Sequence, residues 1–170
     1  MKMDISMKRN LVKCIMYFLE SVFAFALQAT PYLMPELFGE KAVLLLPLAL
    51  SVAFFEEESI AVIMGAFCGV LADFAFDGSI GLFAVSLTIL CYVISLLSRR
   101  YIKISFLSAV LAGCFLTVLI MLIHFVLYFA FSGYNYIMQF FFMHYITRIL
   151  YTLAFVPFFL IISRKLSGNK

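Results

Sequence analysis

The chain has 170 residues, of which 66% are hydrophobic and only 12% are charged, and its mean hydropathy is +1.14. A soluble domain of this size has roughly 45–50% apolar and about 25% charged residues, so the composition excludes a water-soluble globule, and lipid is expected to surround much of the surface. The formal net charge is only +3, and no nucleic-acid partner is expected.

Long apolar stretches follow one another along the chain and predict membrane-spanning helices. A helix needs about 20 mostly apolar residues, each rising about 1.5 Å, to cross a hydrocarbon core about 30 Å thick. The stretches are continuously apolar rather than alternating, which favours an all-α membrane protein over a β-barrel. The chain is predicted to form one domain, residues 1–170, with six spans at 11–30, 42–55, 59–77, 80–98, 104–132 and 139–163.

The first span follows a basic segment that contains Lys8, Arg9 and Lys13, as the apolar part of a signal peptide would. Glu20 interrupts the apolar run, however, and hydrophobic segments continue to the end of the chain. An uncleaved helix is therefore expected.

The second span is the shortest of the six. Its 14 residues lie between Lys41 and Glu56 and would form about 21 Å of helix, which is shorter than the hydrocarbon core. Residues 37–41 could extend it if Lys41 reaches the interface. The acidic residues Glu56–Glu58 that follow are expected to form a solvated cytoplasmic turn.

The third span carries small and acidic residues at intervals of four, namely Ala61, Gly65, Gly69, Asp73 and Asp77. This spacing places them along one ridge of a helix. Gly65 and Gly69 allow a second helix to approach closely. We expect packing within the protein at this ridge, and contact with a partner protein is the alternative.

The distribution of basic residues predicts the orientation in the membrane. With six spans and a cytoplasmic N-terminus, ten of the twelve basic residues lie inside, as the positive-inside rule requires. Omission of the second span alone would move Arg99 and Arg100 to the outside. Both termini are therefore predicted to be cytoplasmic. The ten residues are Lys2, Lys8, Arg9, Lys13, Arg99, Arg100, Lys103, Arg164, Lys165 and Lys170.

Ionisable residues inside the membrane are candidates for function, because each costs at least about 2.5 kcal/mol at the bilayer centre unless it is paired. Glu20 and Arg148 have opposite charges and matched depths, about 14 Å into their spans. A structural ion pair is expected between them, with a proton or ion relay as the alternative. Asp73 is expected to find a partner among His124, His144 and Arg148, and the alternative is a carboxylate that reaches the outer interface.

No residue pattern in the chain indicates an enzyme, a cofactor or a metal site. The cysteines Cys14, Cys68, Cys91 and Cys114 occur singly in or beside apolar runs, without a C-x-x-C motif. Inert thiols are expected at these positions.

The third and fourth spans resemble the bacterial rod shape-determining MreD family. The resemblance extends over essentially the whole chain, although Cys91 stands where glycine is common in the family. The residues that carry it are Gly65, Gly69, Asp73, Gly78, Gly81 and Tyr92, together with Leu27-Gln28, Thr30-Pro31 and Pro47.

The resemblance implies a non-catalytic subunit of the cell-elongation complex in the bacterial cytoplasmic membrane. Its implied partners are the bitopic protein MreC and, through it, MreB filaments, the peptidoglycan polymerase RodA and a transpeptidase. The family is similar in fold to the six-helix substrate-binding subunits of energy-coupling factor transporters, so vitamin uptake is the alternative function.

Such transporter subunits usually carry an A-x-x-x-A step on the first helix, whereas here Gln28 follows Ala24 and Thr30 follows Ala26. This difference favours the scaffold over vitamin uptake. A small ion-coupled transporter is less favoured still, because each span has at most one or two ionisable groups.

Overall fold

The computed structural model of the protein describes residues 5–30, 40–75, 81–100, 106–132 and 145–168. These residues form six α-helices, so the all-helical prediction is confirmed. The helices are α1 (Ile5–Ala29), α2 (Leu45–Phe55), α3 (Glu58–Ala75), α4 (Leu82–Arg100), α5 (Phe106–Ser132) and α7 (Ile146–Ser167).

Four of the helices contain segments long and apolar enough to cross a membrane. These segments are Leu11–Ala29, Glu58–Ala75, Phe106–Leu127 and Ile146–Ser167. The apolar parts of the other two helices, Leu45–Phe55 and Leu82–Ser98, are shorter. Six crossings of the membrane therefore remain a prediction.

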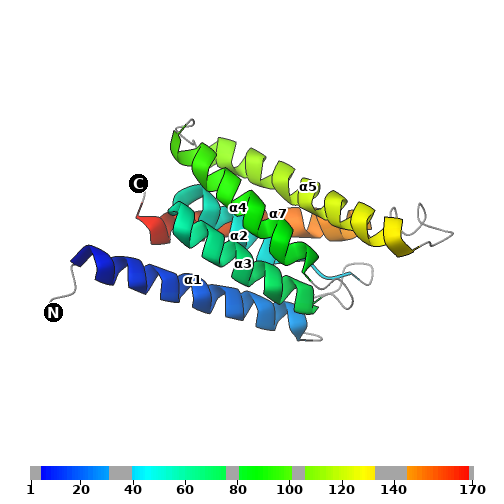
Figure 1. The fold of residues 1–170 in the computed structure, drawn as a ribbon, viewed down its shortest axis with the longest axis horizontal. Helices are drawn as coiled ribbons and strands as arrows, with labels where there is room; N and C mark the ends of the chain where they lie inside the picture. Colours follow the sequence, from blue (N-terminus) through cyan, green and yellow to red (C-terminus); the bar gives the residue numbers. More distant parts are fainter. Residues whose placement is uncertain (1–4, 31–39, 76–80, 101–105, 133–144, 169–170) are drawn as a thin grey trace.

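The helices lie side by side in an elongated bundle, with the start of α1 and the end of α7 at the same end of it (Figure 1). We call this the terminal end, and we call the end that holds Asp73 and Tyr145 the far end. The last residues of α4 and the first residues of α5 also lie at the terminal end (Figure 1). This arrangement is compatible with the predicted position of both termini on one side of the membrane.

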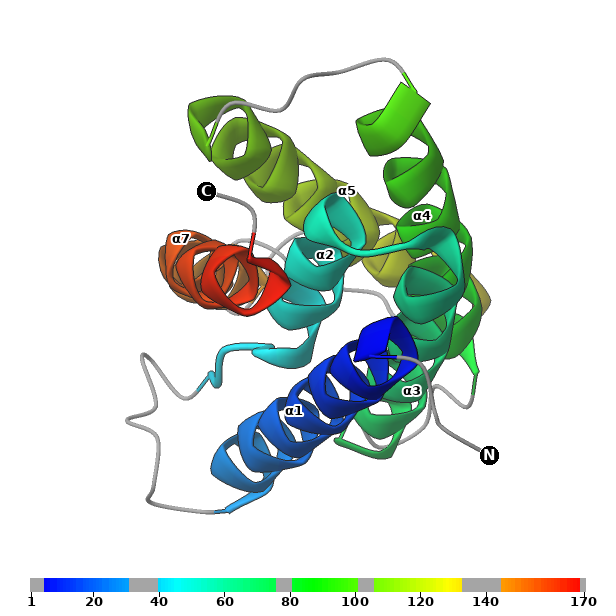
Figure 2. The ribbon, with the colours of Figure 1, turned by 90° about the vertical axis from the view of Figure 1, so that its left-hand side faces the viewer.

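Helix α2 occupies the centre of the bundle (Figure 2). It contacts α1, α3, α4, α5 and α7, and every residue from Leu45 to Phe54 is buried. A helix that is apolar on all sides is stable only when other elements surround it. Pro47 lies in the first turn, where the missing N–H breaks no helical hydrogen bond.

The outer helices present large apolar side chains to their surroundings. Phe74 on α3 and Leu107 on α5 are 75% and 69% exposed, and similar side chains occur on α1, α4 and α7. So much exposed apolar surface is unfavourable in water. The bundle is accordingly a membrane protein with its outer surface in lipid.

Two glycines mark the limits of helices. Gly81, immediately before α4, has a φ of 91°, and Gly168, immediately after α7, has a φ of 73°. Residues with a Cβ rarely adopt such values. Gly168 therefore ends α7 with the left-handed conformation that is common after helices.

Candidate functional site

The ridge on α3 packs against α4. A Cβ added to Gly69 would lie 2.4 Å from the Cα of Ala84, and one added to Gly65 would lie 2.9 Å from the Cβ of Cys91. The absence of side chains at the two glycines therefore allows the helices to approach closely. The ridge is covered by α4 and offers no open surface to another protein.

Asp73 lies at the far end of this ridge and binds the first turn of α4. Its Oδ1 accepts a hydrogen bond of 3.0 Å from the backbone N–H of Phe83, and its Oδ2 accepts one of 3.0 Å from that of Ala84. The first N–H groups of a helix have no partner within the helix and favour a negative charge. Backbone amides thus bind both carboxylate oxygens, and His124 lies close enough to interact electrostatically with this carboxylate.

An aromatic cluster adjoins Asp73 at the far end. The ring of Phe83 stacks on the ring of His124 with 4.0 Å between their centroids. Nδ1 of His124 lies 2.7 Å from the hydroxyl oxygen of Tyr145. These contacts connect α3 and α4 to α5 and to the start of α7.

Arg148 forms an ion pair with Glu40, and the predicted pair of Glu20 and Arg148 is wrong. Nε of Arg148 donates a hydrogen bond of 2.8 Å to Oε2 of Glu40, and its second terminal nitrogen binds the same oxygen. The guanidinium also lies 5.8 Å from the centroid of the Tyr145 ring. Glu40 lies just before α2, so this ion pair joins that segment to α7.

Thr152 adds a further link between these two segments. Its hydroxyl accepts a hydrogen bond of 3.0 Å from the backbone N–H of Val43 and donates one of 2.8 Å to the backbone oxygen of Arg148. We refer to Glu40, Asp73, His124, Tyr145, Arg148 and Thr152 together as the far-end polar cluster.

Glu20 points into the bundle without a partner. Neither of its carboxylate oxygens is accessible or hydrogen-bonded within the described residues. Arg148, the residue expected to neutralise it, binds Glu40.

A second polar network lies at the terminal end, around Glu56. Its Oε1 accepts hydrogen bonds from Nζ of Lys13, at 3.1 Å, and from the hydroxyl of Tyr17, at 3.0 Å. Lys13 also donates to the backbone oxygen of Ser167 at 2.9 Å. The backbone oxygen of Glu56 accepts from the hydroxyl of Ser95 at 3.1 Å. The network therefore joins α1, α4 and α7 to the end of α2.

The expectation of a solvated turn is accordingly wrong for Glu56, which is only 5% exposed. Sequence reasoning missed it, and it also missed Glu40, because both residues lie outside the apolar spans. The spacing of Lys13 and Tyr17, four residues apart on α1, could have indicated a common partner.

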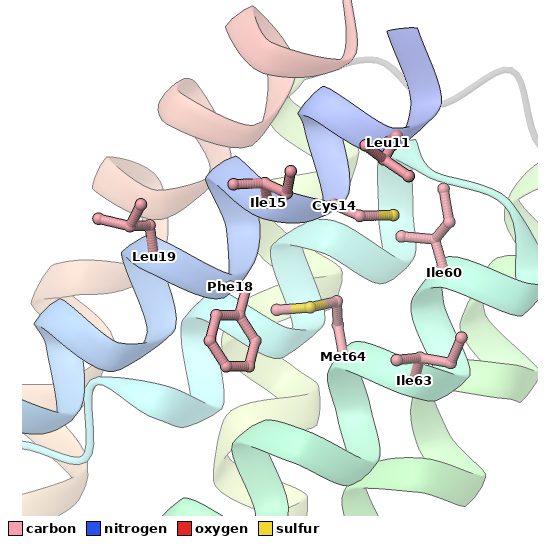
Figure 3. A pocket seen from close by; sticks show the side chains of 8 residues that line it. All are labelled: Leu11, Cys14, Ile15, Phe18, Leu19, Ile60, Ile63 and Met64. Carbon is pink, nitrogen blue, oxygen red and sulfur yellow. The ribbon is translucent and has the colours of Figure 1, made fainter. Parts of the chain in front are cut away.

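An apolar groove lies between α1 and α3 on the outer surface, nearer the terminal end (Figure 3). Its volume is about 390 Å³. The side chains of Ile15 on α1 and Ile63 on α3 are 52% and 65% exposed, so the groove opens toward the bilayer. We call it the α1–α3 groove, and it is lined by Leu11, Cys14, Ile15, Phe18, Leu19, Ile60, Ile63 and Met64.

Neither polar cluster has the composition of a metal site. The part of the chain that the structure describes contains no group of three or more His, Cys, Asp or Glu residues able to hold an ion. The residues of the two clusters form hydrogen bonds and ion pairs between helices. Asp77, predicted to lie on the ridge of the third span, and His144, a predicted partner of Asp73, lie outside the described residues.

Comparison with known proteins gives one match. Residues 8–166 match the family model described as rod shape-determining protein MreD. No curated protein and no solved structure matches the chain. The expected likeness in fold to energy-coupling factor subunits therefore remains a prediction.

Proposed function

The chain belongs to the MreD family of rod shape-determining proteins, and from this premise we propose that it acts as a non-catalytic membrane subunit of the cell-elongation complex. Its partners in this proposal are an MreC-like bitopic protein and, indirectly, MreB filaments, a RodA-type polymerase and a transpeptidase. The complex lies in the bacterial cytoplasmic membrane, which the chain crosses six times with both termini in the cytoplasm. The family match over residues 8–166 is the observation that carries the proposal.

The form of the molecule supports a role in holding other proteins. Its polar side chains are used to join its own helices, as at Glu56 and Asp73. Its outer surface is apolar, so contacts with partners inside the bilayer depend on close packing of helices. Because α4 covers Gly65 and Gly69, a partner helix binds elsewhere on the bundle.

We place the MreC-like transmembrane helix in the α1–α3 groove. Leu11, Ile15 and Leu19 follow one another at intervals of four and form a ridge along one wall. Ile60, Ile63 and Met64 form the other wall. Ridge and groove extend over about 12 Å of α1, which matches two turns of a partner helix.

Substitution of Ile63 by Trp tests this assignment. The indole would fill the groove, so Ile63→Trp should abolish co-purification with the MreC-like partner and should fail to restore rod shape in a deletion strain. Leu111→Trp on α5 is the matched control, because Leu111 is 66% exposed and Ile63 is 65% exposed. Both variants should keep the wild-type melting temperature in detergent. Retention of the partner by a folded Ile63→Trp protein would contradict the location of the interface.

A further inference from the structure

All the buried side-chain oxygens without a hydrogen bond in the described residues belong to α1. They are both carboxylate oxygens of Glu20 and the amide oxygen of Gln28. The remainder of the buried polar network, at Asp73, Glu56 and Arg148, is hydrogen-bonded. The interface between α1 and the rest of the bundle is therefore the part of the core with unsatisfied polar atoms.

From this geometry we infer that Glu20 is a proton-binding site inside the membrane, and that the bound proton keeps α1 seated against the bundle. The inference concerns the chain alone and does not depend on the partners proposed above.

An ionised Glu20 has no compensation in the observed arrangement. An unpaired charge in an apolar interior is far more costly than a neutral carboxyl group. The cations that could neutralise it are engaged elsewhere, Lys13 with Glu56 and Arg148 with Glu40. Lys13 also precedes Glu20 by seven residues, about 10 Å along the helix.

The described groups that face Glu20 include no counter-ion for its charged form. Helix α1 packs against α3 and α2, and it also hydrogen-bonds to backbone oxygens of Ser163 and Ser167 on α7. The titratable neighbour on α3 is the thiol of Cys68, and on α1 it is the hydroxyl of Tyr17. Tyr17 binds the carboxylate of Glu56, at the end of α2. None of these groups provides a positive charge at Glu20.

A proton changes the hydrogen-bonding capacity of this group. The protonated carboxyl has an O–H that can donate to a nearby backbone oxygen, whereas the carboxylate can only accept. Loss of the proton leaves a buried charge that is relieved when α1 moves and the side chain reaches water. The charge state of Glu20 therefore controls the seating of α1.

Dicyclohexylcarbodiimide, an apolar reagent for protonated carboxyl groups, tests the site directly. The carboxyl oxygen adds to the central carbon of the reagent while the carboxyl proton moves to one of its nitrogens, and the adduct rearranges to a stable N-acylurea. In vesicles of phosphatidylethanolamine and phosphatidylglycerol, we expect an adduct on Glu20 that peptide mass spectrometry can locate. The adduct should be lost in Glu20→Gln and retained in Glu58→Gln.

Asp73 provides an internal control for this reaction. Both of its carboxylate oxygens are held by backbone N–H groups, so they are not free to add to the reagent and Asp73 should remain unmodified. Absence of an adduct on Glu20, or equal modification of Asp73, would overturn the inference.

The second test measures how seating depends on pH. The proton avoids an enclosed charge without a counter-ion, so the stabilising effect of the proton is present at low pH and is lost as the pH rises. As the pH rises from about 4, near the value for a glutamate in an unfolded chain, to about 8, the melting temperature of the wild type should fall by about 3 °C or more relative to that of Glu20→Gln. Identical pH profiles for the two proteins would refute control of seating by Glu20.

Discussion

Asp73 lies near the end of α3, and both of its carboxylate oxygens bind N–H groups in the first turn of α4. This contact satisfies a carboxylate in an apolar bundle without a counter-ion. Asp73 and the ridge glycines also belong to the residues that resemble the MreD family. Asp73, Gly65 and Gly69 therefore share one structural role, because all three hold α4 against α3.

Replacement of Asp73 by Asn should lower the free energy of unfolding by about 2 kcal/mol. The amide keeps the volume, but its NH₂ group cannot accept a hydrogen bond from the second N–H of α4. Glu58→Gln, in the first turn of α3, is a suitable control and should cost less than about 1 kcal/mol. Denaturant titration in mixed micelles measures both effects.

Equal stability of Asp73→Asn and wild type would show that the interaction with α4 contributes nothing to the free energy of unfolding.

We also predict that Asp73→Asn reduces shape-maintenance activity at equal membrane abundance, whereas Asp77→Asn has almost no effect. Complementation of a deletion strain compares the two variants.

The sequence predicts the residues of the polar clusters better than it predicts their partners. Glu20, Asp73 and Arg148 are recognisable because a charge within an apolar run is unusual. The hydrogen-bond and ion-pair partners of these residues depend on the orientation of each helix about its own axis and on segments outside the spans. Glu20 and Arg148 were predicted to pair only because their depths in the membrane match. The residue that binds Arg148 is Glu40, which lies before the predicted second span at 42–55.

At the scale of helices, the tightest contact in the bundle lies between α3 and α4. The separation at Gly69 is set by backbone atoms of Phe83 and Ala84, whereas the nearest atoms at Gly65 belong to the side chain of Cys91. Backbone atoms cannot move aside without moving the helix. Gly69 is therefore the position where α3 tolerates a side chain least.

Gly69→Ala should destabilise the protein by about 1–3 kcal/mol, because the two helices must separate to admit a methyl group. Gly113→Ala on α5 is the control, since the nearest atoms to its Cβ would belong to side chains, Cγ1 of Val156 at 3.1 Å and atoms of Leu160 and Phe54 at 3.7 Å. Alanine favours helix over glycine by about 1 kcal/mol at both sites, so the control should be neutral or stabilising. Thermal unfolding in detergent measures the difference in stability between Gly69→Ala and Gly113→Ala. No difference would show that α3 and α4 can move apart without cost.

The ion pair of Glu40 and Arg148 fastens the segment before α2 to α7. Arg148→Met should lower stability by about 3 kcal/mol, because it leaves the Glu40 carboxylate enclosed and without its cation. The double variant Glu40→Gln, Arg148→Met should recover much of that loss. A double-mutant cycle in unfolding free energy gives the coupling, and a value near zero would rule out a stabilising pair.

For the molecule as a whole, topology is the prediction with the widest consequences. Reporter fusions after Asn10, Ser79, Lys103, Tyr134 and Lys170 should report inside, outside, inside, outside and inside. The reason is the predominance of basic residues on one side of the predicted membrane. An outside signal at Lys103 would show that one of the first four spans does not cross.

Composition and the length of the apolar runs predict the all-α fold class and the six helices of the described residues, because both follow from the solvent that surrounds the chain. Whether a given helix faces lipid or protein is harder to predict. The second and fifth spans are both strongly apolar, yet Leu45–Phe54 is buried throughout, whereas Leu107 and Phe115 on α5 face outward. Apolar side chains suit either environment, so their pattern does not distinguish the two.

The central position of α2 has a consequence for biogenesis. With 11 residues it extends about 16 Å, and alone it could not span the bilayer that a newly inserted helix must cross. In the folded protein, α2 is surrounded by α1, α3, α4, α5 and α7. We therefore expect α2 to enter the bilayer together with α3, and its contacts with α7 can form only after α7 has been synthesised. Chains truncated before α7 should therefore be recognised and degraded by membrane quality control.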